Sequence, residues 1–169
     1  MTNFIQRCRG AGGKRPAHPG ARAILLGGLG GFLAIGVLAL LGNKLDVTLL
    51  LGSFGASCVL VFGYPDAPFA QPSNVIGGHL ICTLIGLAAL HGLGPQPWAL
   101  ALAVGCSVAA MMTTRTVHPP AGSNPVIVFL GHSGWGFLLF PVVSGVLILV
   151  LIGYLYNNAV RKSPYPVYW

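Results

Sequence analysis

Long apolar runs without a charged side chain are the feature that most restricts how this chain can fold. Ile24–Gly42 is one such run of about nineteen residues, and about twenty helical residues cross the hydrocarbon core of a bilayer. Across the chain 54% of the residues are hydrophobic and 7% are charged, whereas a soluble domain carries about a quarter charged residues. The sequence therefore predicts an all-α integral membrane protein whose main surroundings are the lipid bilayer.

About six transmembrane segments are expected, two of them short or broken. The segments are Ile24–Gly42, Val47–Gly63, Asn74–Leu93, Trp98–Met112, Val126–Leu130 with the polar stretch before it, and Phe137–Asn157. Three prolines between the second and third segments forbid a continuous helix there. We expect Ser73 to cap the helix that follows.

The basic residues lie mainly in the two tails of the chain. Seven of the nine Lys and Arg residues do so, namely Arg7, Arg9, Lys14, Arg15, Arg22, Arg161 and Lys162. Because cytoplasmic segments of membrane proteins carry the excess of Lys and Arg, we expect both termini to be cytoplasmic, in the cell (inner) membrane. Cations placed at the ends of apolar runs do not form a nucleic-acid-binding face, so nucleic acid is not an expected partner.

The same pattern divides the chain into three parts. Residues 1–23 are a basic cytoplasmic tail, residues 24–158 are the transmembrane domain, and residues 159–169 are a cytoplasmic C-terminal tail. An even number of crossings is required to return the C-terminal cations to the side of the N-terminus. Six crossings satisfy this requirement.

Two stretches of the chain resemble each other. Gly55–Gly63 and Ala121–Gly131 both begin with small residues and continue into a β-branched apolar run that reaches a Phe. Each lies between two full-length segments, so the pattern predicts two inverted three-segment repeats. We expect His118–Pro125 to be extended and Val126–Leu130 to be helical, as a crossing or as a re-entrant loop. Non-helical backbone at this depth must be buried in protein or line a wet cavity.

Paired broken segments in the halves of an inverted repeat are the best sequence indication of a transport site. A helix that starts within the membrane presents free N–H groups and the positive end of its dipole, which suits an anion. The candidate substrate-binding residues are Ser53, Gly55, Ser57, His79, His118, Gly122, Ser123 and Asn124. The alternative is that the small residues serve helix packing, and His79 could equally hold a structural hydrogen bond. If the two breaks are related, Ser57 and Ser123 should approach each other.

The chain contains only two carboxylates, Asp46 and Asp66, and both fall in predicted loops. Cation transporters and proton pumps usually rely on an Asp or Glu within the membrane, so the sequence favours an anion or a neutral solute. Arg115 is a candidate attractor at the mouth of the pathway. We expect no metal and no cofactor, because His79 and His118 have no thiolate or carboxylate at ligand spacing. We also expect no enzyme, since no serine lies in a G-x-S-x-G elbow.

Three separated motifs resemble the HPP family of integral membrane proteins, which is named after a His-Pro-Pro motif. They are Leu51–Ser57, Pro65–His79 and Thr116–Gly122, and the resemblance extends over residues 24–158. It implies a small multi-span membrane protein. For plastid and cyanobacterial members it also implies uptake of nitrite.

These observations together predict transport of a small monovalent inorganic anion, with nitrite as the favoured substrate, through a channel or a carrier. The alternative is a non-transporting membrane scaffold or regulatory subunit, in which the breaks serve only packing. Runs of small residues such as Gly78, Cys82 and Gly86 suit either internal packing or a homo-oligomer interface.

The topology can be tested directly. Reporter fusions at Asn3 and at Trp169 should both report a cytoplasmic location, because this places the two basic tails on one side of the membrane. Opposite locations for the two reporters would contradict an even number of crossings and with it the inverted repeat.

Overall fold

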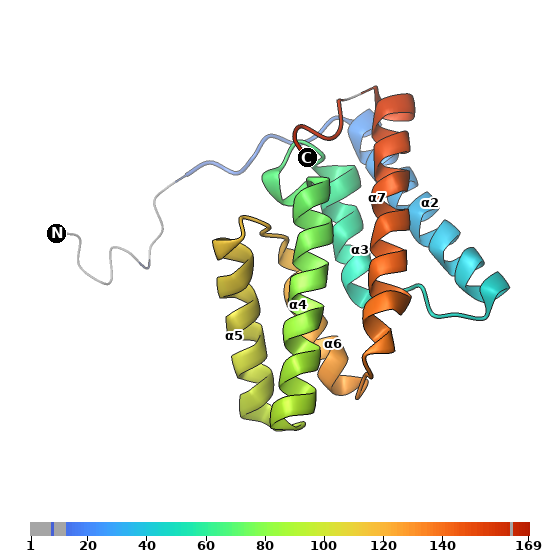
Figure 1. Cartoon of the computed structure of the whole chain (residues 1–169). Helices are drawn as coiled ribbons and strands as arrows, with labels where there is room; N and C mark the ends of the chain where they lie inside the picture. Colours follow the sequence, from blue (N-terminus) through green and yellow to red (C-terminus); the bar gives the residue numbers. More distant parts are fainter. Residues whose placement is uncertain (1–7, 9–12, 163) are drawn as a thin grey trace.

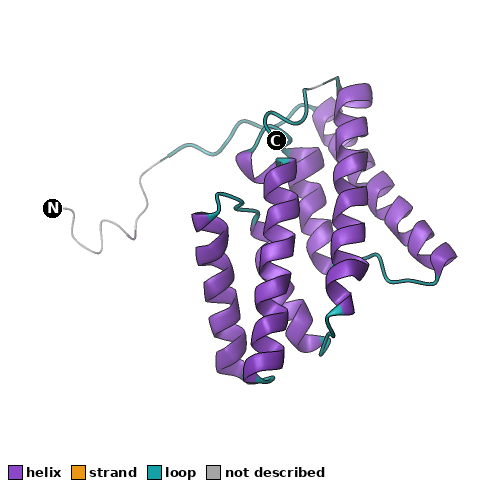
Figure 2. Ribbon diagram, viewed as in Figure 1, coloured by secondary structure: helices purple, strands orange, loops and turns teal. Residues whose placement is uncertain are grey.

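A computed structural model describes Cys8, residues 13–162 and residues 164–169 of the chain. The described residues form helices and no strand (Figure 2). In chain order the elements are α2 (Ala21–Leu45), α3 (Gly52–Cys58), η1 (Val59–Gly63), η2 (Pro68–Ala70), α4 (Pro72–Leu93), α5 (Pro97–Thr113), η3 (Pro119–Ser123), α6 (Asn124–Leu130), η4 (Leu138–Val143), α7 (Ser144–Tyr156) and η5 (Asn157–Arg161). The all-α prediction is confirmed.

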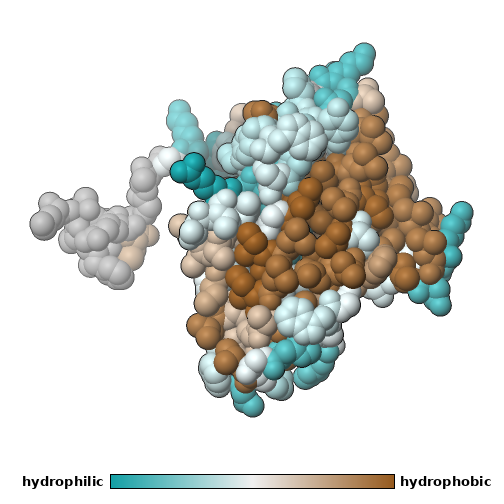
Figure 3. All heavy atoms as spheres, in the orientation of Figure 1, coloured by the Kyte–Doolittle hydropathy of each residue, from teal (hydrophilic) through white to brown (hydrophobic). Residues whose placement is uncertain are grey.

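Three helices are long and apolar enough to cross a membrane. They are Ala21–Leu45, Pro72–Leu93 and Leu138–Arg161, with 25, 22 and 24 residues. Shorter apolar helices cover Gly52–Gly63 and Pro97–Thr113. Hydrophobic side chains form a broad band across the visible face, and hydrophilic side chains gather at its ends (Figure 3). The protein therefore has the surface of a bilayer-spanning helical bundle.

Helix α4 lies at the centre of the bundle, where it contacts α5, α6, α7, η3 and η4 (Figure 1). In the most apolar 18-residue stretch of α4, half of the residues are buried, compared with 17% in that of α2. Helix α2 lies at the edge of the bundle and buries one stripe of residues spaced by four, consisting of Gly30, Ala34, Leu38 and Gly42. The rest of α2 presents large apolar side chains outward, as a lipid-facing helix does.

Two half-length segments lie between the long helices. The first joins α3 to the π-helical turn η1, and the second joins the 3₁₀ helix η3 to α6. At 1.5–2.0 Å per residue each measures about 20 Å, less than the roughly 30 Å of a hydrocarbon core. In Figure 1, α3 runs from the middle of the bundle towards the end where the C-terminus lies, and α6 runs towards the opposite end.

The non-helical parts of these segments differ from the sequence prediction. The small polar stretch from Gly52 to Ser57 was expected to interrupt the second segment, but it is helical as part of α3. The extended backbone precedes it at Leu51, with φ −126° and ψ 145°. His118–Pro125 was expected to be extended, but only its first residue is, because Pro119 opens a 3₁₀ helix that passes directly into α6. Proline suits the first turn of a helix, where no N–H is required.

Two further local predictions were wrong. Gln71, and not Ser73, is the N-cap residue of α4, because Pro72 occupies the first helical position. The last segment is not one regular helix, since Phe140 has φ −129° and ψ 115° in front of Pro141. A proline inside a helix removes one hydrogen bond and kinks the chain at the residue before it.

Close packing of α7 against α3 gives a stability prediction. A Cβ atom added at Gly145 would overlap the Phe54 ring and lie 2.8 Å from the Leu49 carbonyl oxygen. Gly145→Ala should therefore destabilise the protein by about 1–3 kcal/mol, the usual cost of overpacking. The check is thermal unfolding in detergent. Gly36→Ala on α2, where nothing lies within 4 Å, is the control and should not lower the midpoint; equal losses in both variants would contradict the packing.

Candidate functional site

Four separate segments bring four polar side chains together inside the bundle. Ser57 comes from α3, His79 from α4, His118 from the residue before η3, and Asn124 from the start of α6. Each of these residues has an exposed fraction of 0%. We call these four residues the polar cluster. All four are among the candidate residues identified from sequence.

The Ser57 hydroxyl is the centre of the polar cluster. Its Oγ lies 2.8 Å from Nε2 of His118 and 3.1 Å from Nε2 of His79. The same oxygen lies 3.0 Å from the Ser53 carbonyl oxygen, one turn earlier on α3. The two imidazole centroids are 5.1 Å apart. One hydroxyl therefore bridges two imidazole rings.

The hydrogen-bond partners of the two Nδ1 atoms determine which nitrogen of each ring carries the proton in the neutral cluster. Nδ1 of His118 is 2.6 Å from the Phe69 carbonyl oxygen, which can only accept, so this Nδ1 carries the proton and Nε2 accepts from Ser57. Nδ1 of His79 is 3.0 Å from Nδ2 of Asn124, which donates, so Nε2 of His79 carries the proton and donates to Ser57. The donors point in one direction, from Asn124 to the Phe69 carbonyl.

Thr83 extends the polar cluster one turn along α4. Its hydroxyl donates to the His79 carbonyl oxygen at 2.7 Å and accepts from Asn124 Nδ2 at 2.8 Å. Two buried atoms nearby, Asn124 Oδ1 and Ser53 Oγ, have no hydrogen-bond partner among the described residues. Buried polar atoms without partners are uncommon. These two atoms are therefore the places in the site that are open to a further polar group.

Glycines on α4 allow the second half-length segment to approach closely. A Cβ atom at Gly78 would lie 2.8 Å from His118 Cβ, and one at Gly86 would lie 2.9 Å from Pro125 Cα. Phe54 packs edge-on against the His79 ring, with the centroids 5.3 Å apart. The glycines thus allow the close approach of α4 to the second half-length segment, and Phe54 packs against the imidazole ring that faces Ser57.

The other candidate residues lie outside the polar cluster. Ser123 is exposed and donates to the Pro120 carbonyl oxygen at 2.8 Å, so the two breaks meet through Ser57 and His118 and not through Ser57 and Ser123. Gly122 is half-buried with nothing within 4 Å of an added Cβ. Arg115 is exposed, and its φ of 57° ends α5 in a left-handed turn.

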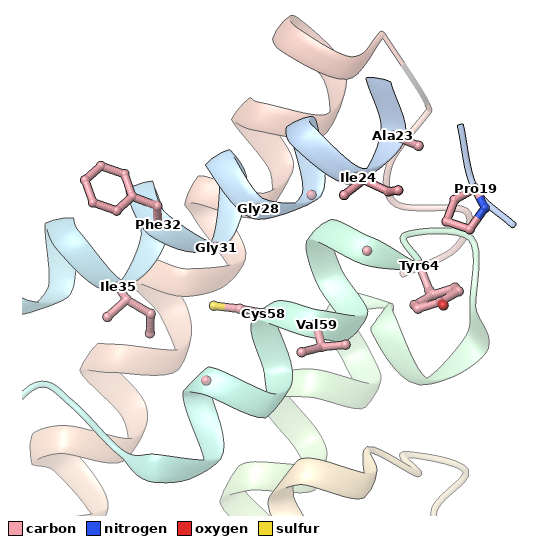
Figure 4. A pocket seen from close by; sticks show the side chains of 13 residues that line it. Pro19, Ala23, Ile24, Gly28, Gly31, Phe32, Ile35, Cys58, Val59 and Tyr64 are labelled. Carbon is pink, nitrogen blue, oxygen red and sulfur yellow. The ribbon is translucent and has the colours of Figure 1, made fainter. Parts of the chain in front are cut away.

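Gly55 faces a different feature, an apolar groove between α2 and α3 with a volume of about 460 Å³ (Figure 4). The groove is lined from α2 by residues that include Gly28, Gly31 and Phe32, and from the first half-length segment by Gly55 and Cys58. On a helix, Ser53 and Ser57 share one face and Gly55 lies on another. The groove is therefore separate from the polar cluster.

Sequence reasoning did not identify the loop between η1 and α4 as part of the site. Gln71 is fully buried there, and its Nε2 donates to the carbonyl oxygens of Pro65 and Ala67 at 2.8 and 2.9 Å. The C-terminal segment covers this loop, because Tyr165 donates from its hydroxyl to the Ala70 carbonyl oxygen at 2.7 Å. Burial raises the pKa of Tyr165, so its hydroxyl keeps the proton that it donates. The signal available in the sequence was a glutamine, Gln71, inside a proline-rich loop.

Comparison with known proteins places this arrangement in a family. A family model described as "HPP, transmembrane region" matches residues 16–166. The chain belongs to the HPP family. Two transmembrane proteins of Dictyostelium discoideum are 37% and 36% identical over the whole chain, which spans 64% and 58% of their lengths. The chain therefore covers less than two thirds of these relatives. No solved structure matches it.

The His-Pro-Pro motif of this HPP protein has a clear structural role. His118 is the motif histidine that reaches Ser57, and the two prolines open η3 immediately behind it. Among the described residues, no group of three or more His, Cys, Asp and Glu side chains lies together in a way that could hold a metal ion. The chemistry that the site offers is hydrogen bonding by neutral groups and proton binding by two imidazoles.

The bridging role of Ser57 can be tested by stability. Ser57→Ala removes the partner of both Nε2 atoms, and a buried polar group without a partner costs about 1–3 kcal/mol. We expect a lower thermal midpoint in detergent than for the parent protein. Ser107→Ala is the matched control, because Ser107 is an equally buried serine on α5 outside the polar cluster. A loss in Ser107→Ala as large as that in Ser57→Ala would contradict the bridge.

Proposed function

We propose that this HPP protein transports a small monovalent anion, with nitrite as the favoured substrate, across the cell membrane. The observation that carries the proposal is the meeting of two half-length segments at a fully buried cluster of neutral polar groups. Broken segments that meet inside a bundle are the usual construction of a transport site. The pathway would run where α3 faces η3 and α6.

The chemistry of the buried groups favours an anion over a cation. An anion that leaves water needs N–H and O–H donors in place of its hydration. Ser53, Ser57, Asn124 and the two imidazoles can supply such donors. The buried polar side chains of the described residues include no Asp or Glu, the groups that usually bind cations within a membrane.

Two inverted three-segment halves would explain why the half-length segments meet. The first half would contain α2, α3 with η1, and α4, and the second would contain α5, η3 with α6, and η4 with α7. The opposite directions of α3 and α6 in Figure 1 support this interpretation. Six segments would place both termini on the cytoplasmic side, together with Arg115, Arg161 and Lys162, while Lys44 would lie outside.

Full burial of the polar cluster also favours a second candidate function. Its side chains have no exposed surface, and most of their polar atoms have partners. A scaffold or regulatory subunit would need only this internal bond network. For transport, by contrast, the segments must move apart to admit the anion, which is the behaviour of a carrier with alternating access.

Nitrite uptake into proteoliposomes distinguishes the two candidates. Wild-type protein should take up nitrite faster than protein-free vesicles, and Asn124→Ala should slow uptake roughly tenfold to a hundredfold, because a hydrogen bond to a charged group contributes about 1.5–3 kcal/mol. Ser123→Ala changes the neighbouring residue, which is exposed, and should retain the parent rate. Each variant should keep the parent elution volume in detergent. Asn124→Ala should also lower the thermal midpoint, because it leaves Nδ1 of His79 without a partner, so uptake is compared at a temperature where both variants are folded. Folded wild-type protein without uptake would leave the scaffold as the better proposal.

A further inference from the structure

We infer that the polar cluster binds one proton together with the anion, so that the two cross the membrane as a neutral pair. This inference rests on the proposed anion transport and names its coupling ion. It depends on the hydrogen-bond geometry around Ser57, in which Nε2 of His118, both nitrogens of His79 and the Ser57 hydroxyl can exchange donor and acceptor roles without a change in the positions of the ring atoms.

The neutral cluster is a single chain of donors. Asn124 donates to Nδ1 of His79, Nε2 of His79 donates to Ser57, Ser57 donates to Nε2 of His118, and Nδ1 of His118 donates to the Phe69 carbonyl. Every ring nitrogen then has one role. An added proton on Nε2 of His118 requires the Ser57 hydroxyl to turn away, either towards the Ser53 carbonyl oxygen at 3.0 Å or towards Nε2 of His79 at 3.1 Å.

In the second case, one added proton reverses every bond from His118 Nε2 to Asn124, and only the bond to the Phe69 carbonyl keeps its direction. His118 then carries protons on both nitrogens and donates to the Phe69 carbonyl and to Ser57. Ser57 turns its hydroxyl to donate to Nε2 of His79, and the proton of His79 moves to Nδ1. The sum is one proton bound and one positive charge gained: His118 gains an N–H bond at Nε2, and His79 exchanges its N–H bond at Nε2 for one at Nδ1. The heavy-atom distances of 2.6–3.1 Å suit both directions.

Reversal also changes what Asn124 offers to a ligand. Nδ1 of His79 now donates, so the Asn124 amide must turn by half a rotation to present Oδ1 to it. Thr83 can then donate to Oδ1 instead of to the His79 carbonyl. The amide nitrogen moves to the place now occupied by Oδ1, which has no partner among the described residues. Two N–H donors then face this place, and an oxyanion supplies the acceptors that they need.

Electrostatics links the two binding events. A lone imidazolium or a lone anion in this buried site lacks a counter-charge, and burying an unpaired charge is costly. The surrounding elements do not supply one. Cys82 on α4 packs beside Met111 and Ala121, while Asp66 before η2 and Arg115 after α5 are exposed. The proton and the anion therefore each stabilise the other.

The test uses purified full-length protein in liposomes that contain a pH-sensitive dye, with valinomycin and equal potassium holding the membrane potential at zero. Addition of nitrite outside should acidify the lumen at the rate of nitrite uptake, one proton per anion. Protein-free vesicles measure the leak of nitrous acid through lipid, which is subtracted. An inside-positive potential should leave the uptake rate unchanged, and an outside that is more acidic by one pH unit should drive about tenfold accumulation.

Two outcomes would overturn the inference, and they differ for the proposed function. Nitrite uptake that leaves the lumenal pH unchanged and accelerates with an inside-positive potential would show an anion moving alone, so anion transport would stand and proton coupling would fail. Absence of uptake at every pH would remove both.

A pair of histidine variants assigns the effect to the polar cluster. His118→Gln should lose at least tenfold of the proton-coupled rate. His91→Gln should keep it, because His91 stacks on Trp135 and bonds to the Ser133 carbonyl oxygen away from the cluster. Equal coupling in both variants would contradict the assignment. If His118→Gln does not fold, the potential and pH measurements on wild-type protein still decide the question.

Discussion

Backbone that is not helical cannot face lipid, because hydrocarbon offers no partner for its N–H and C=O groups. At the starts of its two half-length segments this chain places such backbone inside the bundle, at Leu51 before α3 and at His118 before η3. Both are buried, and Ser57 and His118 join the segments that carry them. The surrounding helices shield this non-helical backbone from lipid. Helix α4 packs against the second segment, which its glycines allow to approach closely, and reaches the first through His79.

The polar cluster depends in turn on a cover of loop and C-terminal segment. The direction of its hydrogen bonds is set by the Phe69 carbonyl, which is held in a short 3₁₀ turn. Gln71 donates to two backbone carbonyls that precede that turn, and its Oε1 accepts from the Val167 N–H at 2.8 Å. Tyr165 holds the neighbouring carbonyl of Ala70. A displacement of the C-terminal segment would therefore act on His118 through two hydrogen bonds, from Tyr165 to the Ala70 carbonyl and from His118 to the adjacent Phe69 carbonyl.

Sequence patterns predicted the helical class, the long spans and the four residues of the polar cluster. The long spans followed from apolar length alone, which is a strong constraint in lipid. Gly55 was assigned to the site with Ser53 and Ser57 because the stretch was interpreted as a break; helical spacing puts Gly55 on the face towards α2 instead. Thr83 lies one turn after His79, but nothing in the sequence marked it as a partner of Asn124. The Phe69 carbonyl could not have been predicted, since a backbone acceptor has no side-chain signature.

Two imidazoles sharing one hydroxyl also fix how many protons the polar cluster can hold. With the ring centroids 5.1 Å apart, two positive charges would repel by about 3 kcal/mol at an effective dielectric constant near 20. Each tenfold change in occupancy corresponds to about 1.4 kcal/mol, so a second proton is disfavoured by roughly a hundredfold. A site that holds either no proton or one is matched to a monovalent anion. A divalent anion would leave a net negative charge in a bundle whose described buried side chains include no Lys or Arg to balance it.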